Sequence, residues 1–67
     1  MRVDVLEGDV IITAKENEYH IIMASLRELV AEMHESDFLP RVGVSRKEVS
    51  ELAQTFFDES VRLGIEE

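Results

Sequence analysis

The sequence predicts a single small α+β domain, in which an N-terminal β-hairpin is followed by two antiparallel amphipathic helices. Three observations support this prediction. Turn-forming residues separate two β-branched segments near the N-terminus, apolar residues then recur at spacings of three and four, and a capping signal precedes each of these helical stretches. At 67 residues the chain has room for one domain, which we expect to span 1–67.

The predicted hairpin has strands at about 3–6 and 10–13, on either side of Glu7-Gly8-Asp9. Asp and Gly favour turns, whereas the flanking Val and Ile residues favour strands. Because a two-stranded hairpin is not stable alone in water, we expect one of its faces to pack on the helices. A single bent strand is the alternative.

The first helix is predicted at about 14–35. Thr13 and Glu16 have the spacing of a capping box, in which each side chain bonds the backbone N–H of the other residue. Apolar residues at spacings of three and four then define one side of the helix. These residues are Tyr19, Ile22, Met23, Leu26, Leu29, Val30 and Met33. We expect this side to face the core.

Residues 36–44 form the predicted connection between the helices. Pro40 lacks a backbone N–H and clashes with the preceding turn, so it opposes a long helix here. A short extended segment or a single helical turn would both fit. Phe38, Leu39 and Val42 are too apolar for a free loop, and we expect them to close the end of the core.

The second helix is predicted at about 46–63. Ser45 and Glu48 form a second capping box, and Gly64 with Ile65 matches a left-handed helix end followed by an apolar residue. The apolar side expected to face the core consists of Val49, Leu52, Ala53, Phe56 and Leu63.

Composition narrows the range of functions. The formal net charge is −8, which disfavours binding to phosphate backbones but favours rapid association with a basic partner. The chain has no cysteine, no apolar signal segment near its start and no apolar run long enough to span a membrane. We therefore expect a cytoplasmic protein without membrane contact.

Catalytic residues are not apparent. Nucleophilic catalysis needs a Ser or Cys beside an oriented base, and His20 and His34 lie about 21 Å apart if both belong to one helix. With Arg27, the two histidines line the border of the apolar side, where a half-exposed polar flank is favoured over a pH-sensitive site. Neighbouring carboxylates fit a solvated helix face better than an acid–base pair. We expect no enzymatic activity, metal or cofactor.

The segment 43–52 resembles the turn and recognition helix of helix-turn-helix DNA-binding proteins, because a turn glycine precedes an apolar residue, a Ser cap and a helix. The residues that would contact an anion are Arg41, Arg46 and Lys47. The sequence departs from that pattern at Pro40, which would lie inside the preceding helix, and at the acidic residues that follow. A capped helix that begins with a cationic turn is therefore favoured, and nucleic-acid binding is the alternative.

A second resemblance covers more of the chain. The hairpin and Thr-capped helix are followed by Phe38, Arg41, Gly43 and Val44, then by Ser45-Arg46. This order is similar to the F-x-x-R-x-G-V layout of a group of short uncharacterised bacterial proteins. That group brings no established activity, so the resemblance implies a fold and not a function.

Some apolar residues lie outside the predicted core. The first helix carries Ile21 with Ala24 and Glu28 around it, and the second carries Phe57 and Val61. Three explanations compete: the hairpin covers one of these flanks, the flanks form a homodimer contact, or they receive a different protein.

Charge favours a protein partner. Residues 48–67 carry net −5, whereas residues 35–47 carry net +1. We therefore expect a non-catalytic protein-interaction module, such as an immunity protein, antitoxin, inhibitor or small regulatory subunit, that binds a basic partner. The candidate contact residues are Glu51, Phe57, Asp58, Glu59 and Val61. A small helix-turn-helix-like regulator that binds nucleic acid is the alternative.

Overall fold

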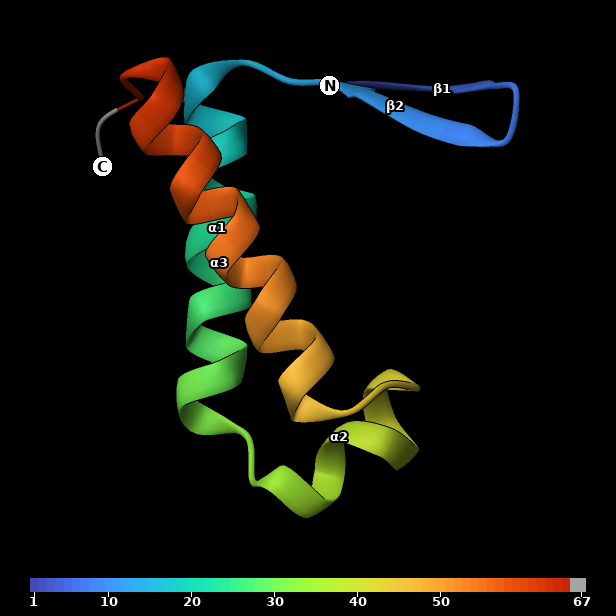
Figure 1. Cartoon of the computed structure of the whole chain (residues 1–67), viewed down its shortest axis with the longest axis vertical. Coiled ribbons are helices and arrows are strands. Elements are labelled where there is room, and N and C mark those ends of the chain that lie inside the picture. The colour runs from blue at the N-terminus through green and yellow to red at the C-terminus, as the bar shows by residue number, and fades with distance from the viewer. Residues whose placement is uncertain (66–67) are drawn as a thin grey trace.

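The computed structural model describes residues 1–65 and has two strands followed by three helices (Figure 1). The elements are β1 Arg2–Leu6, β2 Asp9–Thr13, α1 Glu16–Glu32, α2 Glu35–Val42 and α3 Arg46–Leu63. The predicted α+β class and the N-terminal hairpin are confirmed. The structure has one helix more than the sequence indicated.

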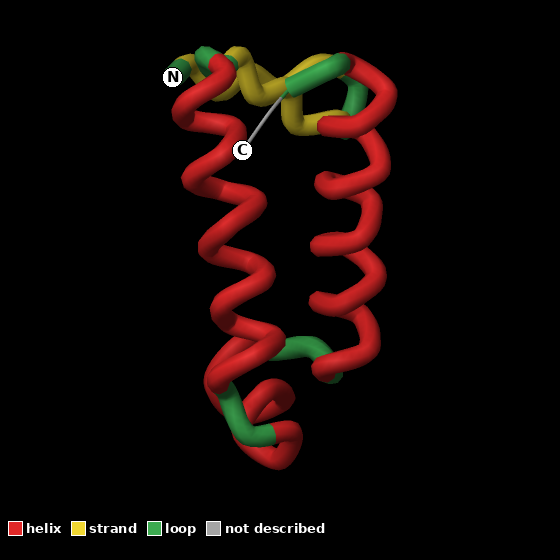
Figure 2. The backbone as a smooth tube through the Cα atoms, turned by 90° about the vertical axis from the view of Figure 1, so that its left-hand side faces the viewer, coloured by secondary structure: helices red, strands yellow, loops and turns green. Residues whose placement is uncertain are grey.

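The two long helices, α1 and α3, lie side by side and run antiparallel (Figures 1 and 2). Near the start of α1, the hydroxyl of Tyr19 donates a 2.6 Å hydrogen bond to the carbonyl oxygen of Phe56, in the C-terminal half of α3. Near the end of α1, the carbonyl oxygen of Val30 accepts from the guanidinium of Arg46, the first residue of α3. These contacts fix the pair at both ends.

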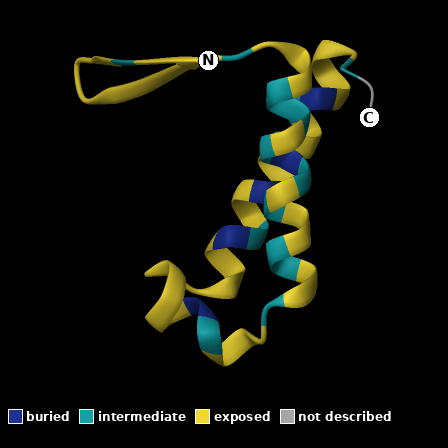
Figure 3. Cartoon of the chain, turned by 180° about the vertical axis from the view of Figure 1, so that it is seen from behind, coloured by how far each residue is buried: buried dark blue, intermediate teal, exposed yellow. Residues whose placement is uncertain are grey.

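The core lies between α1 and α3 and continues under α2 (Figure 3). Its buried apolar side chains are Met23, Phe38, Val49 and Ala53, and Met23 and Phe38 are fully buried. All seven apolar residues predicted to face the core from the first helix are buried or half-buried. The predicted core side of that helix is therefore confirmed.

The predicted core side of α3 is wrong at two residues. Leu52 and Leu63 are 50% and 56% exposed. The buried line instead follows spacings of four, three and four, through Val49, Ala53, Phe56 and Ser60. Ser60 is tolerated there because its hydroxyl donates a 2.6 Å hydrogen bond to the carbonyl oxygen of Phe57.

The connection between the long helices contains the eight-residue α2, with Pro40 inside it, where the sequence predicted an extended segment or a single turn. The N–H that Pro40 lacks would have bonded the carbonyl oxygen of Ser36. Ser36 is exposed, so water can take that place at low cost. His34 caps the start of α2 by accepting from the Ser36 N–H at 3.2 Å. Gly43 ends the helix with a left-handed φ of 92°.

Fewer side chains of α2 close the core than the sequence predicted. Phe38 is fully buried, as expected. Leu39 and Val42 are exposed, because the helical turn directs them away from the α1–α3 pair. One aromatic side chain therefore closes this end of the core.

The start of α1 also differs from the prediction. Thr13 is not a helix cap, because it belongs to β2 and pairs with Arg2. The helix begins two residues later, and the N–H of Lys15 donates to Glu18 Oε1 at 2.9 Å. The capping box predicted for Thr13 and Glu16 is wrong. The helix also ends at Glu32, three residues before the predicted end.

Both predicted ends of α3 are confirmed. Ser45 Oγ accepts from the N–H of Glu48 at 3.3 Å. Gly64 adopts a left-handed φ of 73°, and the N–H of Ile65 donates back to the Ser60 carbonyl oxygen at 2.9 Å.

The hairpin projects from the end of the helix pair as an arm (Figure 1). In the part of the chain that the structure describes, neither strand packs against a helix, so the predicted packing of the hairpin is wrong. The connection to α1 is only residues 14–15, and Lys15 is extended with ψ 161°, which leads the strands away from the helices. A 3.1 Å ion pair between the Met1 ammonium group and Glu18 holds the base of the arm.

Candidate protein-interaction surfaces

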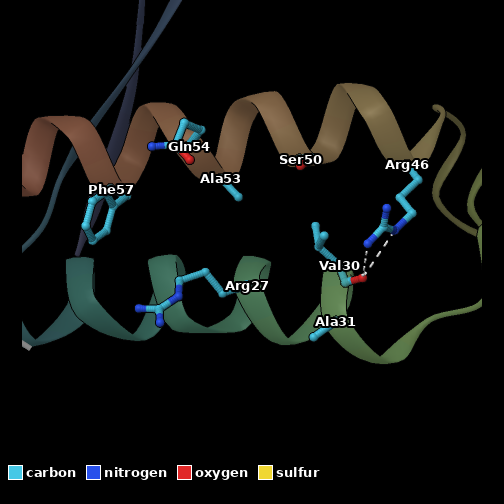
Figure 4. A pocket seen from close by; sticks show the side chains of 8 residues that line it. All are labelled: Arg27, Val30, Ala31, Arg46, Ser50, Ala53, Gln54 and Phe57. Carbon is cyan, nitrogen blue, oxygen red and sulfur yellow. Dashed lines mark hydrogen bonds between the residues drawn. The ribbon is translucent and has the colours of Figure 1, made fainter.

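A groove of about 510 Å³ runs along one side of the α1–α3 pair (Figure 4). Its α1 wall consists of Arg27, Val30 and Ala31. Its α3 wall consists of Arg46, Ser50, Ala53, Gln54 and Phe57. Four of these lining residues are apolar, and the other four are polar or charged, including the guanidinium groups of Arg27 and Arg46. Of these eight residues, only Phe57 and Arg46 were candidate contact residues from the sequence.

The guanidinium of Arg46 joins α3 to α1 by hydrogen bonds. Its Nε and Nη2 atoms donate to the Val30 carbonyl oxygen at 3.3 and 3.2 Å (Figure 4). The contact supplies a partner to a carbonyl near the C-terminal end of α1 and places a cation at the negative end of that helix. The other two residues expected to contact an anion are both exposed: Arg41 lies in the last turn of α2 and Lys47 in the first turn of α3.

Four of the five candidate partner contacts lie on neighbouring sides of α3. At about 100° per residue, Phe57 and Val61 share the flank beside the groove, and Glu51 and Asp58 lie on the adjoining outward side. Phe57 is 43% exposed and Val61 65% exposed. Both carboxylates are exposed, and Asp58 Oδ1 accepts from Gln54 Nε2 at 2.9 Å.

The fifth candidate contact, Glu59, lies on the other flank of α3. It is half-buried and forms an ion pair with the Nε of Arg62 at 2.5 Å. A shallow hollow of about 350 Å³ lies on that side, lined by Tyr19, Thr55, Phe56, Glu59, Arg62 and Leu63. Leu63 is exposed here because it lies outside the buried line of α3. Glu59 therefore belongs to a different surface from the other four.

Burial raises the pKa of the Tyr19 phenol at the edge of this hollow, and the Glu59 carboxylate raises it further. The neutral hydroxyl is the form that donates to the Phe56 carbonyl oxygen. The raised pKa keeps the phenol in this neutral form and so preserves the hydrogen bond between α1 and α3.

The apolar flank that the sequence indicated on the first helix lies on the side of α1 away from α3. Ile21 is exposed, Ala24 is half-buried and Glu28 is exposed. The hairpin covers neither this face nor the flank of Phe57 and Val61. The explanation that assigned these apolar residues to the hairpin is therefore wrong.

The two histidines are at separate places, as the spacing indicated. His34 Nδ1 caps α2 and lies 2.8 Å from Ser36 Oγ. His20 Nδ1 is buried and has no hydrogen-bond partner within residues 1–65. Over the same residues, no three His, Cys, Asp or Glu side chains are close enough to hold a metal ion. No described helix is long and apolar enough to cross a membrane.

A further apolar surface was missed by sequence reasoning. In the hairpin, Val3 pairs with Ile12 and Val5 with Val10, so these four side chains share one face of the ribbon. Each of them is exposed. The alternation Val-Asp-Val in β1 is the signal that could have located this face.

Comparison of the chain with protein-family models, with curated protein sequences and with solved structures found no match.

Proposed function

We propose that the protein is a non-catalytic interaction module that binds a basic protein along α3. The observation that carries the proposal is the placement of exposed Phe57 and Val61 beside the carboxylates of Glu51 and Asp58. Exposed apolar side chains beside several carboxylates are a common composition for a docking surface. Burial of the apolar side chains supplies affinity, and the negative charge orients an approaching basic partner. An immunity protein, antitoxin, inhibitor or small regulatory subunit would present such a surface.

The groove gives Phe57 and its neighbours a shape that a partner side chain can enter. Its lining includes the small side chains of Ala31, Ser50 and Ala53, which leave room for a partner side chain. The carboxylates that a cationic partner group would meet, Glu51 and Asp58, lie on the outward side of α3. The net charge of −8 would accelerate the encounter with a basic protein at low ionic strength. The cytoplasmic location expected from the sequence stays a prediction.

The test separates charge from apolar contact. A protein captured from cells of the source organism is purified, and its association with the wild type and two double variants is followed by surface plasmon resonance over a salt series. Glu51→Lys with Asp58→Lys should slow association at least tenfold at low salt and flatten its salt dependence. Phe57→Ala with Val61→Ala should mainly accelerate dissociation.

A charge-matched control places the same change on another surface. Glu28→Lys with Glu32→Lys alters the exposed outward side of α1 by an equal charge. This variant should keep most of the association rate. Equal slowing by both lysine pairs would mean that net charge acts without a specific face. Unchanged association in the α3 pair would contradict the proposal.

A second candidate function is nucleic-acid binding through α2 and α3. The supporting observation is that a helix does form through Pro40, followed by the three-residue turn 43–45 and by α3. This is the order of a helix-turn-helix, and it removes one departure from that pattern. Glu48 and Glu51, early in α3, remain unfavourable neighbours for phosphate.

A mobility-shift assay with duplex DNA tests this second candidate. Binding should appear at about 50 mM salt, weaken steeply as salt rises, and be lost in Arg41→Ala with Lys47→Ala. Arg46 is left unchanged in this variant because it holds α1 to α3. No shift at low salt would exclude the function for the DNA used.

A further inference from the structure

The hairpin is a folded ribbon with one wholly uncharged apolar face. The cross-strand pairs Val3–Ile12 and Val5–Val10 build this face, which we call the valine face. Strand alternation places the charged residues Arg2, Asp4 and Asp9 on the opposite face, together with Leu6, Ile11 and Thr13. All the charged residues of the two strands therefore lie on one face, and the valine face carries none, as it would if it were packed against another surface.

Nothing in residues 1–65 covers the valine face. Its four side chains are between 51% and 74% exposed, and neither strand packs on a helix. Figure 3 shows the ribbon exposed along almost its whole length. A two-stranded hairpin without a packed face is marginal in water, so its stability has to come from a surface outside the single chain.

The accessible surface of the chain is larger than that of a compact monomer of the same mass. A folded monomer of 7.7 kDa is expected to expose about 4,300 Å². This chain exposes 5365 Å². The chain as a whole, with its projecting ribbon, therefore exposes roughly 1,000 Å² more than a compact chain, which is enough to supply the share of about 800 Å² that each partner buries in a standard interface. The Cα radius of gyration agrees, at 13.2 Å against about 11 Å for a compact chain of this length.

We propose that the valine face packs against the valine face of a second copy of this chain, so that the protein is a homodimer joined through its hairpins. A twofold contact brings identical surfaces together, and an uncharged face can meet itself without like-charge repulsion. The opposite face could not, since it would bring Asp4 and Asp9 of two copies together. A basic partner would gain no ion pair from the valine face.

The negative charge on the helices does not strongly oppose a contact between two valine faces. The carboxylates of α3 lie on the helical body, from which the ribbon projects (Figure 1). At physiological salt, interactions between exposed charges are screened over about 8 Å. The dimer leaves both copies of α3 exposed, so it does not depend on the proposed binding of a basic protein.

The test is the molar mass in solution, measured by light scattering coupled to size exclusion from 1 to 500 µM. The wild type should approach twice the 7.7 kDa chain mass as the concentration rises. Because both copies are acidic, raising salt from 50 to 500 mM should leave dimerisation unchanged or strengthen it. Association with a basic protein should respond in the opposite direction, which separates the two proposals.

Matched variants locate the contact. Val5→Thr with Val10→Thr keeps β-branched side chains and strand propensity but adds hydroxyl groups to the valine face. This pair should weaken dimerisation at least tenfold, whereas Ile11→Thr on the opposite face should leave it within threefold. Helical circular dichroism should be unchanged in both, since the ribbon packs on no helix.

Two results would overturn the proposal. One is a wild type that stays monomeric up to 500 µM, which would leave the valine face to a different protein. The other is a dimer that survives the valine-face pair and is lost instead in Ile21→Ser or Phe57→Ser, which would place the contact on the helices.

Discussion

The hydroxyl of Tyr19 donates a 2.6 Å hydrogen bond to the carbonyl oxygen of Phe56, and the two rings lie 5.2 Å apart between centroids. The pair joins the first turn of α1 to the C-terminal half of α3, so it fixes the antiparallel helices toward the end from which the hairpin leaves. The ring contact and the hydrogen bond act together, because the tilted stack holds the phenol where its hydroxyl reaches the backbone.

Tyr19→Phe should lower the free energy of unfolding by about 1 kcal/mol, because it removes the hydrogen bond and keeps the ring contact. In a domain of this size, that loss lowers Tm by about 4–8 °C. Urea denaturation followed by circular dichroism measures the change. Thr55→Ala is the control, since it removes an exposed hydrogen bond to the Glu51 carbonyl oxygen and should cost less than about 0.5 kcal/mol. Equal losses in the two variants would contradict this account.

Alkaline pH should loosen the same contact. The pKa of Tyr19 is raised in the folded protein, so its contribution to stability is complete below the usual tyrosine pKa and is lost as pH rises through the folded value. Tyr19 is the only tyrosine, so its ionisation can be followed directly by ultraviolet absorbance. The urea midpoint of the wild type should fall above about pH 10, and that of Tyr19→Phe should fall less. Parallel curves would refute the assignment.

Acidic pH should reduce stability through Glu18, in the first turn of α1. The N–H of Lys15, and then the terminal ammonium group, lower the pKa of Glu18. The stability from this lowered pKa is present above the usual glutamate pKa and is lost as pH falls through the folded value. Glu18→Gln should therefore reduce the acid dependence of Tm between about pH 5 and 2. Glu16→Gln removes the same charge from the same helical turn, and it should retain the wild-type dependence if Glu18 is responsible.

Phe38 should be essential to folding. Its truncation to Ala removes the fully buried ring that closes one end of the core, at a cost of about 3–5 kcal/mol. A domain of this size has little more stability than that, so Phe38→Ala should be largely unfolded at 25 °C by circular dichroism. Leu39→Ala, at an exposed neighbour in the same helix, should stay folded. A folded Phe38→Ala would show that α2 does not close the core.

Local signals in the sequence located much of the helical pair. The three- and four-residue spacing from Tyr19 to Met33 identified the core side of α1, and Ser45 with Gly64 marked both ends of α3. The errors came from competition between neighbouring features. Thr13 has the chemistry of a cap, but pairing with Arg2 retains it in the strand. Pro40 opposes a helix, but at an exposed position near the end of a short one its cost is small.

The position of the hairpin could not be derived from its sequence. Alternation in β1 shows that one face should be covered, but it does not say whether the cover comes from this chain or another. The answer depends on the two-residue connection before α1, where the extended Lys15 leads the ribbon away from the helices. The candidate contact residues on α3 were likewise identified by residue type alone. Their angular positions around the helix then place Glu59 on a different side from the other four.

The most direct test of the account is an isotope-filtered NMR experiment on a mixture of ¹³C-labelled and unlabelled protein. It detects only contacts between copies. The account predicts intermolecular nuclear Overhauser effects between methyl groups of the valine face, linking Val3 and Val5 of one copy to Val10 and Ile12 of the other. Their absence at millimolar concentration, in a sample whose cross-strand contacts show a formed hairpin, would contradict the account.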